Sequence, residues 1–357
     1  MKMTLRWFYT ADTIPLEYMK QVPGISGVVG ALYDVPVGDV WEKDKIKPMM
    51  EKAKRAGLPI EVIESVNIHE DIKLGLPTRE VYIDNYKQTI KNLADYGVKV
   101  ICYNFMPIFD WTRSSLAYPL EDGSTVLSYE RAVIEGVTPA DMIKRMKDAS
   151  GSYQMPGWEP ERLADIEQLF KAYETVTETD LFQHLVYFLE SIMPTLKETG
   201  IQMAIHPDDP PWPVFGLPRI LKDKQDIERL LEALPEQENG VTFCTGSLGA
   251  RQANDLLDIA EYCLKQDRMP FVHIRNITHT KDGDFHEVSH YDKSGSVDVV
   301  GLIKLLHTYQ YDGYVRPDHG RMIWGEEARP GYGLYDRALG AMYMTGIWDS
   351  LEEGTTC

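Results

Sequence analysis

The stretch Tyr311–Gly340 reads YDGYVRPDHGRMIWGEEARPGYGLYDRALG. It opens as a short apolar strand that runs to Arg316, and Asp318 and His319 follow where that strand ends. A carboxylate next to an imidazole suits metal binding or proton transfer. Asp and Gly are also common turn residues, so this pair alone fits an ordinary strand-to-helix turn equally well.

Three earlier strands end in a similar way. His206 follows IQMAI, Cys244 follows GVTF and His273 follows MPFV. Imidazole, thiolate and carboxylate groups are side chains that bind transition metals. Four strand ends that carry such groups seldom arise by chance, so we expect the four side chains to converge on one metal ion.

The order of the elements predicts an α/β protein built on a (β/α)8 TIM barrel, since eight parallel strands close such a barrel. The predicted strands are Thr4–Phe8, Gly27–Leu32, Ile60–Ser65, Val98–Asn104, Ile201–His206, Val241–Cys244, Phe271–Ile274 and Gly313–Arg316. An open, doubly wound sheet is the alternative, but it would place its site at one switch point. Ligand residues at the ends of strands five to eight favour the closed barrel.

Segments with helical periodicity separate the strands. They are Lys45–Ala56, Arg79–Tyr96, Asp180–Glu198, Gln225–Leu234, Ala253–Lys265 and Val297–Tyr309. Gly57, Gly97 and Gly200 each follow a helical segment and introduce the next strand, as glycine often does at a helix C-terminus. Such alternation implies parallel strands joined by right-handed crossovers.

The alternation breaks between residues 108 and 179, after the fourth predicted strand. Long insertions of this kind are commonly lids or interfaces. We expect one barrel domain over residues 1–357, in which the insertion is a lid over the barrel mouth or an oligomer contact, with surface decoration as the third alternative. Trp111 and Trp158 are the large apolar groups of this otherwise polar segment.

Composition excludes several classes of partner. The chain has 357 residues and a formal net charge of −18, which repels polyanions, so nucleic acid is not an expected partner. A small anionic substrate fits if local arginines reverse the field in the pocket. The opening MKMTLRWFYT lacks the apolar core of a signal peptide, and no later run approaches a membrane span. These features predict a cytoplasmic protein without membrane contact.

The four cysteines lie far apart in the sequence, and a reducing compartment disfavours disulfides. Cys102 and Cys263 lie in apolar segments and are expected to be small core residues. Cys357 is the last residue. Only Cys244 is therefore expected to have a role in a site.

Alternation within the strands places further polar groups beside the metal candidates. His273 and Arg275 share one face of their strand, and Arg316 and Asp318 share a face of theirs. Charge inside a barrel is costly unless it is paired or bound to metal. By ligand softness, zinc or iron fits a thiolate first. A closed four-ligand zinc site would be structural, whereas an ion that accepts further ligands favours Mn²⁺ or Fe²⁺.

Long motifs along the whole chain resemble those of the mannonate dehydratase family. They are MTLRWFY, YDVPVG, CYNFMPIFDWTR, HPDDPP, FCTGSLG, HIRN, RPDHGRMIWGE and GYGLYDRALG. The resemblance implies a xylose-isomerase-like barrel, conversion of D-mannonate to 2-keto-3-deoxy-D-gluconate in hexuronate (glucuronate) breakdown, and Mn²⁺ as the working ion, with Fe²⁺ as the alternative. The metal ligands that it implies are His206, Cys244, His273 and Asp318. It implies His319 and Tyr332 as the proton-transferring pair.

Arg275 and Arg316 have two readings. Their forked donors suit the carboxylate of a sugar acid, and they equally suit a structural ion pair with a barrel carboxylate. The rival function is a metal-dependent sugar isomerase of the same barrel fold, against which a thiolate ligand argues. A nuclease would need a basic surface. A homo-oligomer, most simply a dimer, is the expected assembly.

Overall fold

Eight parallel strands close into a barrel in the computed structural model, which describes residues 1–150, 166–281 and 283–354. Their order around the barrel is β1-β12-β9-β8-β7-β4-β3-β2. Their bounds are β1 Lys2–Arg6, β2 Ile25–Gly30, β3 Val62–Glu64, β4 Val100–Tyr103, β7 Gln202–Ile205, β8 Asn239–Cys244, β9 Phe271–Ile274 and β12 Tyr314–Pro317. Each corresponds to a predicted strand, so the predicted TIM barrel is confirmed.

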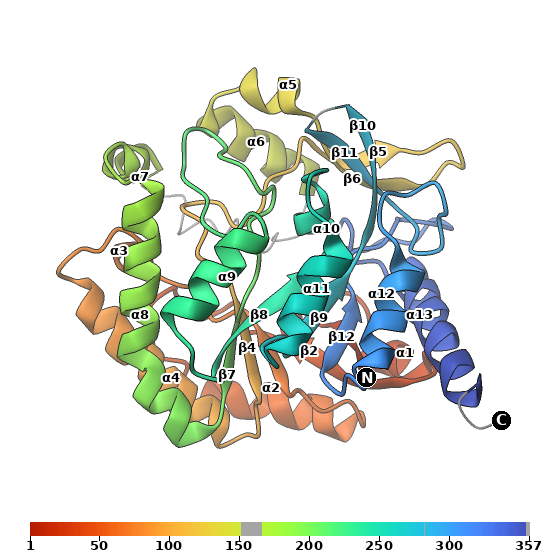
Figure 1. Ribbon diagram of the computed structural model, residues 1–357, viewed down its shortest axis with the longest axis horizontal. Coiled ribbons are helices and arrows are strands. Elements are labelled where there is room, and N and C mark those ends of the chain that lie inside the picture. Colours follow the sequence, from red (N-terminus) through yellow and green to blue (C-terminus); the bar gives the residue numbers. More distant parts are fainter. Residues whose placement is uncertain (151–165, 282, 355–357) are drawn as a thin grey trace.

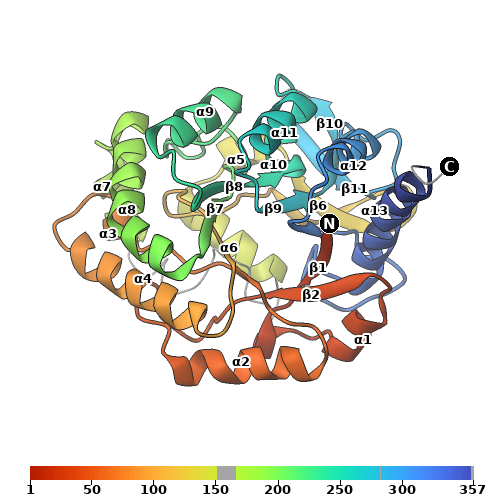
Figure 2. The same ribbon diagram turned by 60° about the horizontal axis from the view of Figure 1, so that its bottom comes forward.

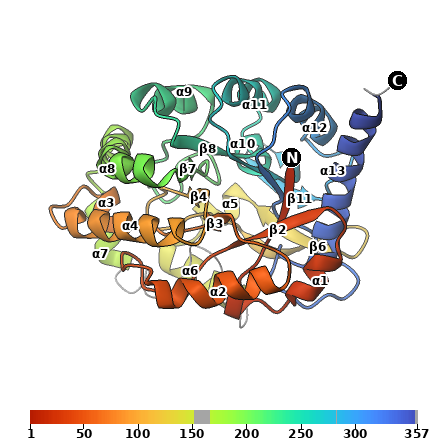
Figure 3. The same cartoon turned by 90° about the horizontal axis from the view of Figure 1, so that it is seen from below.

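Helices surround the barrel (Figures 2 and 3). They are α1 Leu16–Gln21, α2 Lys43–Arg55, α3 Glu70–Lys73, α4 Arg79–Ala94, α8 Glu178–Thr199, α9 Lys224–Ala233, α10 Thr245–Gly249, α11 Leu256–Lys265, α12 Val299–Thr308 and α13 Leu334–Gly354. All six predicted helices form. No helix within the described ranges is both long and apolar enough to cross a membrane.

Local chemistry sets the helix ends. Helix α8 begins with a capping box, in which Thr177 and Asp180 exchange side-chain and backbone hydrogen bonds, and it ends at Gly200 with φ +70°. Helix α11 begins later than predicted, because the Asp255 carboxylate accepts the backbone N–H groups of Leu257 and Asp258 and so caps the helix there.

Strand register places the candidate site residues side by side. His273 on β9 is paired with Cys244 on β8 and with Arg316 on β12. Two residues before His273, Phe271 belongs to an apolar cluster contributed by six barrel strands, and the two rings stand edge to face with centroids 4.5 Å apart. The polar groups therefore lie directly next to an apolar layer inside the barrel.

A second sheet lies outside the barrel, and the sequence prediction missed it. Its order is β10-β11-β6-β5, and it contains β5 Ser115–Pro119, β6 Thr125–Tyr129, β10 Asn276–Lys281 and β11 Asp284–Val288. Strands β5 and β6 come from the predicted insertion, whereas β10 and β11 form a hairpin directly after β9. Figure 1 shows these strands together with α5 (Arg131–Glu135) and α6 (Pro139–Ser150) at one end of the barrel.

The insertion therefore has its own secondary structure, which ends with α7 (Ile166–Tyr173). Trp111 is 8% exposed and forms an isolated parallel bridge with Asp209, which lies beyond β7. Trp158 lies outside the described residues. The lid and the oligomer contact stay predictions.

Candidate active site

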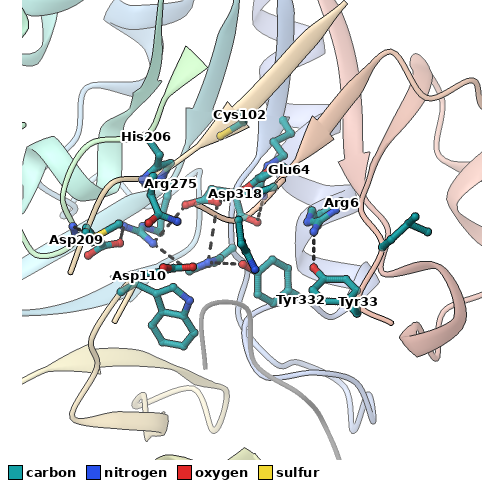
Figure 4. Close-up of a pocket in the computed structure, with 18 residues that line it drawn as sticks. Arg6, Tyr33, Glu64, Cys102, Asp110, His206, Asp209, Arg275, Asp318 and Tyr332 are labelled. Carbon is teal, nitrogen blue, oxygen red and sulfur yellow. Dashed lines mark hydrogen bonds and ion pairs between the residues drawn. The ribbon is translucent and has the colours of Figure 1, made fainter. Parts of the chain in front are cut away.

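One pocket opens at the carboxyl ends of the barrel strands, where TIM-barrel enzymes carry their active sites. It is lined by Arg6 at the end of β1, Glu64 at the end of β3, and His206, Arg275 and Asp318 just beyond β7, β9 and β12. Figure 4 shows these side chains pointing toward one another around the pocket. His319, Tyr332 and Arg316 also line it.

The four predicted metal ligands come together beside this pocket. Ligand atoms of His206, Cys244 and His273 all lie within 4.8 Å of one another. Asp318 completes the group, since its Oδ1 lies 3.6 Å from Nδ1 of His273 and its Oδ2 lies 3.7 Å from the sulfur of Cys244. Two imidazoles and one thiol thus lie close together, and one carboxylate lies next to two of them.

The chemistry of these donors fits a divalent cation. Nδ1 of His273 is buried and has no hydrogen-bond partner among the described residues, which leaves a polar atom for which a metal would account. Nδ1 of His206 lies 2.8 Å from the Pro207 carbonyl oxygen, and a carbonyl only accepts hydrogen bonds. That contact places the hydrogen of a neutral His206 on Nδ1 and leaves Nε2 as the ligand atom.

The Cys244 thiol has the electrostatics of a ligand. Burial and the Asp318 carboxylate act to raise its pKa, but Arg275 and His206 outweigh them, so the pKa of Cys244 lies well below that of an ordinary thiol. Burial acts to lower the pKa of His206, but the neighbouring Cys244 and Asp318 outweigh it and raise that pKa to about 9. A thiolate is the form of cysteine that binds metal.

A second group of ligand-type side chains lies next to the first and is made of Glu64, Cys102 and His273. The Arg316 guanidinium already pairs with its carboxylate: Nη2 lies 2.8 Å from Oε1 of Glu64, and Nε lies 3.1 Å from Oε2. Nε2 of His273 lies 3.5 Å from the same Oε2, and a hydrogen on Nε2 directed at that carboxylate leaves Nδ1 as the ligand atom of a neutral His273. Burial raises the pKa of the Cys102 thiol well above its usual range. Cys102 is 1% exposed and Cys263 is fully buried, which confirms that both are core residues.

His319 and Tyr332 form a contact pair at the pocket. Nε2 of His319 lies 3.0 Å from the Tyr332 hydroxyl oxygen, and both side chains are almost fully buried. Burial raises the pKa of the Tyr332 phenol above its usual value, although Arg316 acts in the opposite direction. The phenol is therefore held in its protonated form, next to an imidazole nitrogen that can exchange a proton with it.

Both predicted substrate arginines make ion pairs within the barrel. Nη2 of Arg275 lies 2.9 Å from Oδ2 of Asp209, and Nη2 of Arg316 lies 2.8 Å from both Glu64 and Asp318. Each still lines the pocket. These contacts support the structural role of the two arginines as partners of barrel carboxylates. Their role in substrate binding stays a prediction.

The family model that matches this chain is described as D-mannonate dehydratase (UxuA), and it covers residues 1–356. The chain belongs to the D-mannonate dehydratase family. Like its relatives in that family, it is an enzyme. The mannonate dehydratase of Geobacillus thermodenitrificans is 58% identical to it, over 99% of this chain and 95% of that protein.

Solved structures agree with this family and with the expected fold. The crystal structure of mannonate dehydratase from Streptococcus suis serotype 2 matches with a TM-score of 0.90 at 43% identity, over 99% of this chain and 96% of that one. A xylose isomerase domain protein from Planctomyces limnophilus matches with a TM-score of 0.56 at 11% identity, over 98% of each chain. At that identity the likeness shows a common fold alone.

Several pocket residues were not predicted from the sequence. Arg6 and Glu64 stand at the ends of β1 and β3, so the strand-end rule that pointed to Cys244 applied to them too. Glu287, on β11, lies 2.8 Å from Nδ1 of His319 and belongs to the hairpin that was not predicted. No pattern in the sequence pointed to it.

Proposed function

We propose that this chain dehydrates D-mannonate to 2-keto-3-deoxy-D-gluconate in hexuronate breakdown. Family membership supports the substrate. The observation that carries the proposal is the contact between His319 and Tyr332 in a pocket that His206 and Asp318 also line, with Cys244 and His273 next to Asp318. Dehydration of a sugar acid needs both parts, because the hydrogen beside a carboxylate is weakly acidic and a hydroxyl is a poor leaving group.

Mn²⁺ is the metal of this proposal, with Fe²⁺ as the alternative. His206, Cys244, His273 and Asp318 would hold it, and either ion accepts further ligands beyond these four. When bound, the cation supplies positive charge for the substrate oxygens and so favours loss of the proton at carbon 2. Arg275, whose Nη1 lies 3.3 Å from Oδ2 of Asp318, helps to fix that carboxylate in its ligand position.

His319 and Tyr332 divide the proton transfers in this proposal. Nε2 of His319 takes the proton from carbon 2. The Tyr332 phenol, whose pKa is raised by burial, keeps its hydrogen and donates it to the departing hydroxyl at carbon 3. Because the two groups are in contact, the proton gained by His319 can then return to Tyr332.

Arg6 is the cation that we assign to the substrate's negative charge. Its Nη1 donates to the Val29 carbonyl at 2.9 Å, and its Nη2 contacts the Tyr33 hydroxyl. In the described part of the chain no carboxylate lies within ion-pair distance of Arg6, unlike Arg275 and Arg316. Its positive charge is therefore available to a sugar acid, which fits the predicted small anionic substrate.

The test is turnover with defined metal. Metal-stripped protein is supplied with Mn²⁺ or Fe²⁺ and D-mannonate, and formation of a 2-keto acid is measured, with an aldose as the control for isomerase activity. The proposal predicts a 2-keto acid from D-mannonate only when metal is added, and no ketose from the aldose. Ketose from the aldose without any 2-keto acid would contradict it. A homo-dimer and a cytoplasmic location stay predictions.

A further inference from the structure

His319 has two opposed neighbours at its second ring nitrogen. Nδ1 lies 2.8 Å from Oε1 of Glu287 and 3.0 Å from Nη1 of Arg275. A carboxylate oxygen only accepts a hydrogen bond, whereas a guanidinium nitrogen only donates one. The two neighbours therefore favour different tautomers of the imidazole, and only one of them can bond to Nδ1 at a time.

The distances favour Glu287 as the partner. Its contact with Nδ1 is the shorter of the two, at 2.8 Å against 3.0 Å. Nη1 of Arg275 has other acceptors for its hydrogens, since Oε1 of Glu287 and Oδ2 of Asp318 each lie 3.3 Å away. The hydrogen of a neutral His319 is thus placed on Nδ1, and the lone pair is on Nε2.

The position of Glu287 is fixed by burial, by strand pairing and by a neighbouring cation. It is 2% exposed and lies on β11, which pairs with β6 of the insertion through Phe285 opposite Tyr129 and His286 opposite Ser128. Nη2 of Arg113, from the start of the insertion, lies 3.7 Å from Oε1 of Glu287. A buried carboxylate requires such cationic neighbours. The second sheet thereby brings an anion to the barrel mouth.

We propose that Glu287 is a positioning residue that fixes the tautomer of His319, with hydrogen on Nδ1 and the lone pair of Nε2 directed at Tyr332 and the substrate. This inference rests on the proposed role of His319 as the group that accepts the carbon-2 proton. It gives the second sheet a part in the reaction, because that sheet carries the residue that orients the imidazole.

Loss of Glu287 would leave Arg275 as the remaining neighbour of Nδ1 of His319. With no acceptor at Nδ1, the Arg275 guanidinium at 3.0 Å becomes its only hydrogen-bonding partner in this group of contacts and donates to it. The ring hydrogen then moves to Nε2, which can no longer accept a proton from carbon 2. A wrong tautomer of a catalytic histidine costs turnover without moving the side chain.

Two variants and a matched control test the proposal. Glu287→Leu removes the acceptor. Glu287→Gln keeps an oxygen at the position of Oε1, since Arg275 and Arg113 favour the amide oxygen on their side. Asp284→Asn makes the same carboxylate-to-amide change on the same strand, where Oδ1 accepts the backbone N–H of Arg131. Metal content, kcat and KM for D-mannonate are measured for each.

We expect Glu287→Leu to lower kcat by roughly 10²–10⁴-fold with KM and metal content unchanged, Glu287→Gln to recover most of that loss, and Asp284→Asn to match the parent. A role limited to neutralising Arg113 and Arg275 predicts instead that both Glu287 variants lose metal and raise KM equally. That result, or normal kcat in Glu287→Leu, overturns the proposal.

NMR of the His319 ring tests the positioning role of Glu287 independently of the proposed activity. In Zn²⁺-loaded protein with ¹⁵N-labelled histidine, the His319 signals should show a protonated Nδ1 and an unprotonated Nε2, and Glu287→Leu should reverse them. A parent protein with the hydrogen on Nε2 refutes the positioning role, even if Glu287→Leu does not fold. Correct tautomer signals in a protein that does not act on D-mannonate would refute the activity instead.

Discussion

The sulfur of Cys244 lies 3.7 Å from Oδ2 of Asp318, although the pKa of each group is lowered, which favours the anionic form of both. Burial acts to raise the pKa of Asp318, and His319 and Arg316 outweigh it. Two buried anions at this distance repel each other unless positive charge offsets them. Arg275, whose Nη1 lies 3.3 Å from Oδ2 of Asp318, supplies part of that charge, and a metal ion bound by both side chains would supply more.

Replacement of the thiolate tests that reading. We expect Cys244→Ser to lose metal and activity together while the barrel stays folded, because a hydroxyl remains protonated and is a poor ligand. The loss of metal affinity should exceed the roughly 10–100-fold effect of losing an outer partner of a ligand. Metal analysis and turnover measure it, and Cys263→Ser, a buried thiol on α11, is the control. Full occupancy and normal turnover in Cys244→Ser would remove Cys244 from the site.

Substitutions of His319 and Tyr332 should affect turnover without affecting metal binding. His319→Asn and Tyr332→Phe are each expected to retain metal and to lose turnover by roughly 10²–10⁴-fold, the usual contribution of a positioned acid or base. Tyr343→Phe, on α13 and away from the pocket, removes a phenol as a matched control. Near-normal rates in either site variant, or lost metal as the main effect, would show that the residue only supports the loop or orients Asp318.

Substrate charge should be recognised through Arg6. Arg6→Met removes a charge-assisted hydrogen bond of about 1.5–3 kcal/mol, which corresponds to a roughly ten- to hundredfold rise in KM. Metal content should stay at the parent level, because Arg6 contacts none of the four donor residues in the described contacts. Steady-state kinetics on D-mannonate provide the measurement, and Arg55→Met, at an exposed position at the end of α2, is the control. An unchanged KM would return the substrate charge to Arg275 or Arg316.

The insertion should respond to substrate if it is a lid. Trp111 lines the pocket, so D-mannonate is expected to change tryptophan fluorescence, and Trp111→Phe should abolish that change. Residues 108–179 should also become protected from proteolysis when substrate is present. An oligomer contact would make protection depend on protein concentration instead. If neither substrate nor concentration has an effect, the insertion is surface decoration.

The metal donors were predictable because the ends of parallel strands meet on one face of a barrel. The identity of the residue at each strand end, such as Cys244 or Asp318, was then enough to place it. Arg6 and Glu64 obey the same rule and were overlooked, because a charged residue beside a strand is usually exposed. The rule concerns backbone geometry, and it does not say which charges face inward.

Glu287 could not be predicted from the ends of the barrel strands. Its position depends on the antiparallel pairing of β11 with β6, two strands far apart in the sequence. A local pattern cannot specify that pairing, since strand partners are chosen by tertiary packing. The second sheet and the carboxylate that it brings to His319 therefore became visible only in the folded chain.

The most direct test of the account is turnover of D-mannonate in D₂O. In the proposed reaction the hydrogen at carbon 2 leaves as a proton, the hydroxyl at carbon 3 departs, and the resulting enol takes one new proton at carbon 3. That proton comes from solvent, so the product should carry one deuterium at carbon 3, detected by NMR or mass spectrometry. A hydride shift between carbons would bring in little from water. Product without solvent deuterium at carbon 3 would contradict the dehydration proposed here.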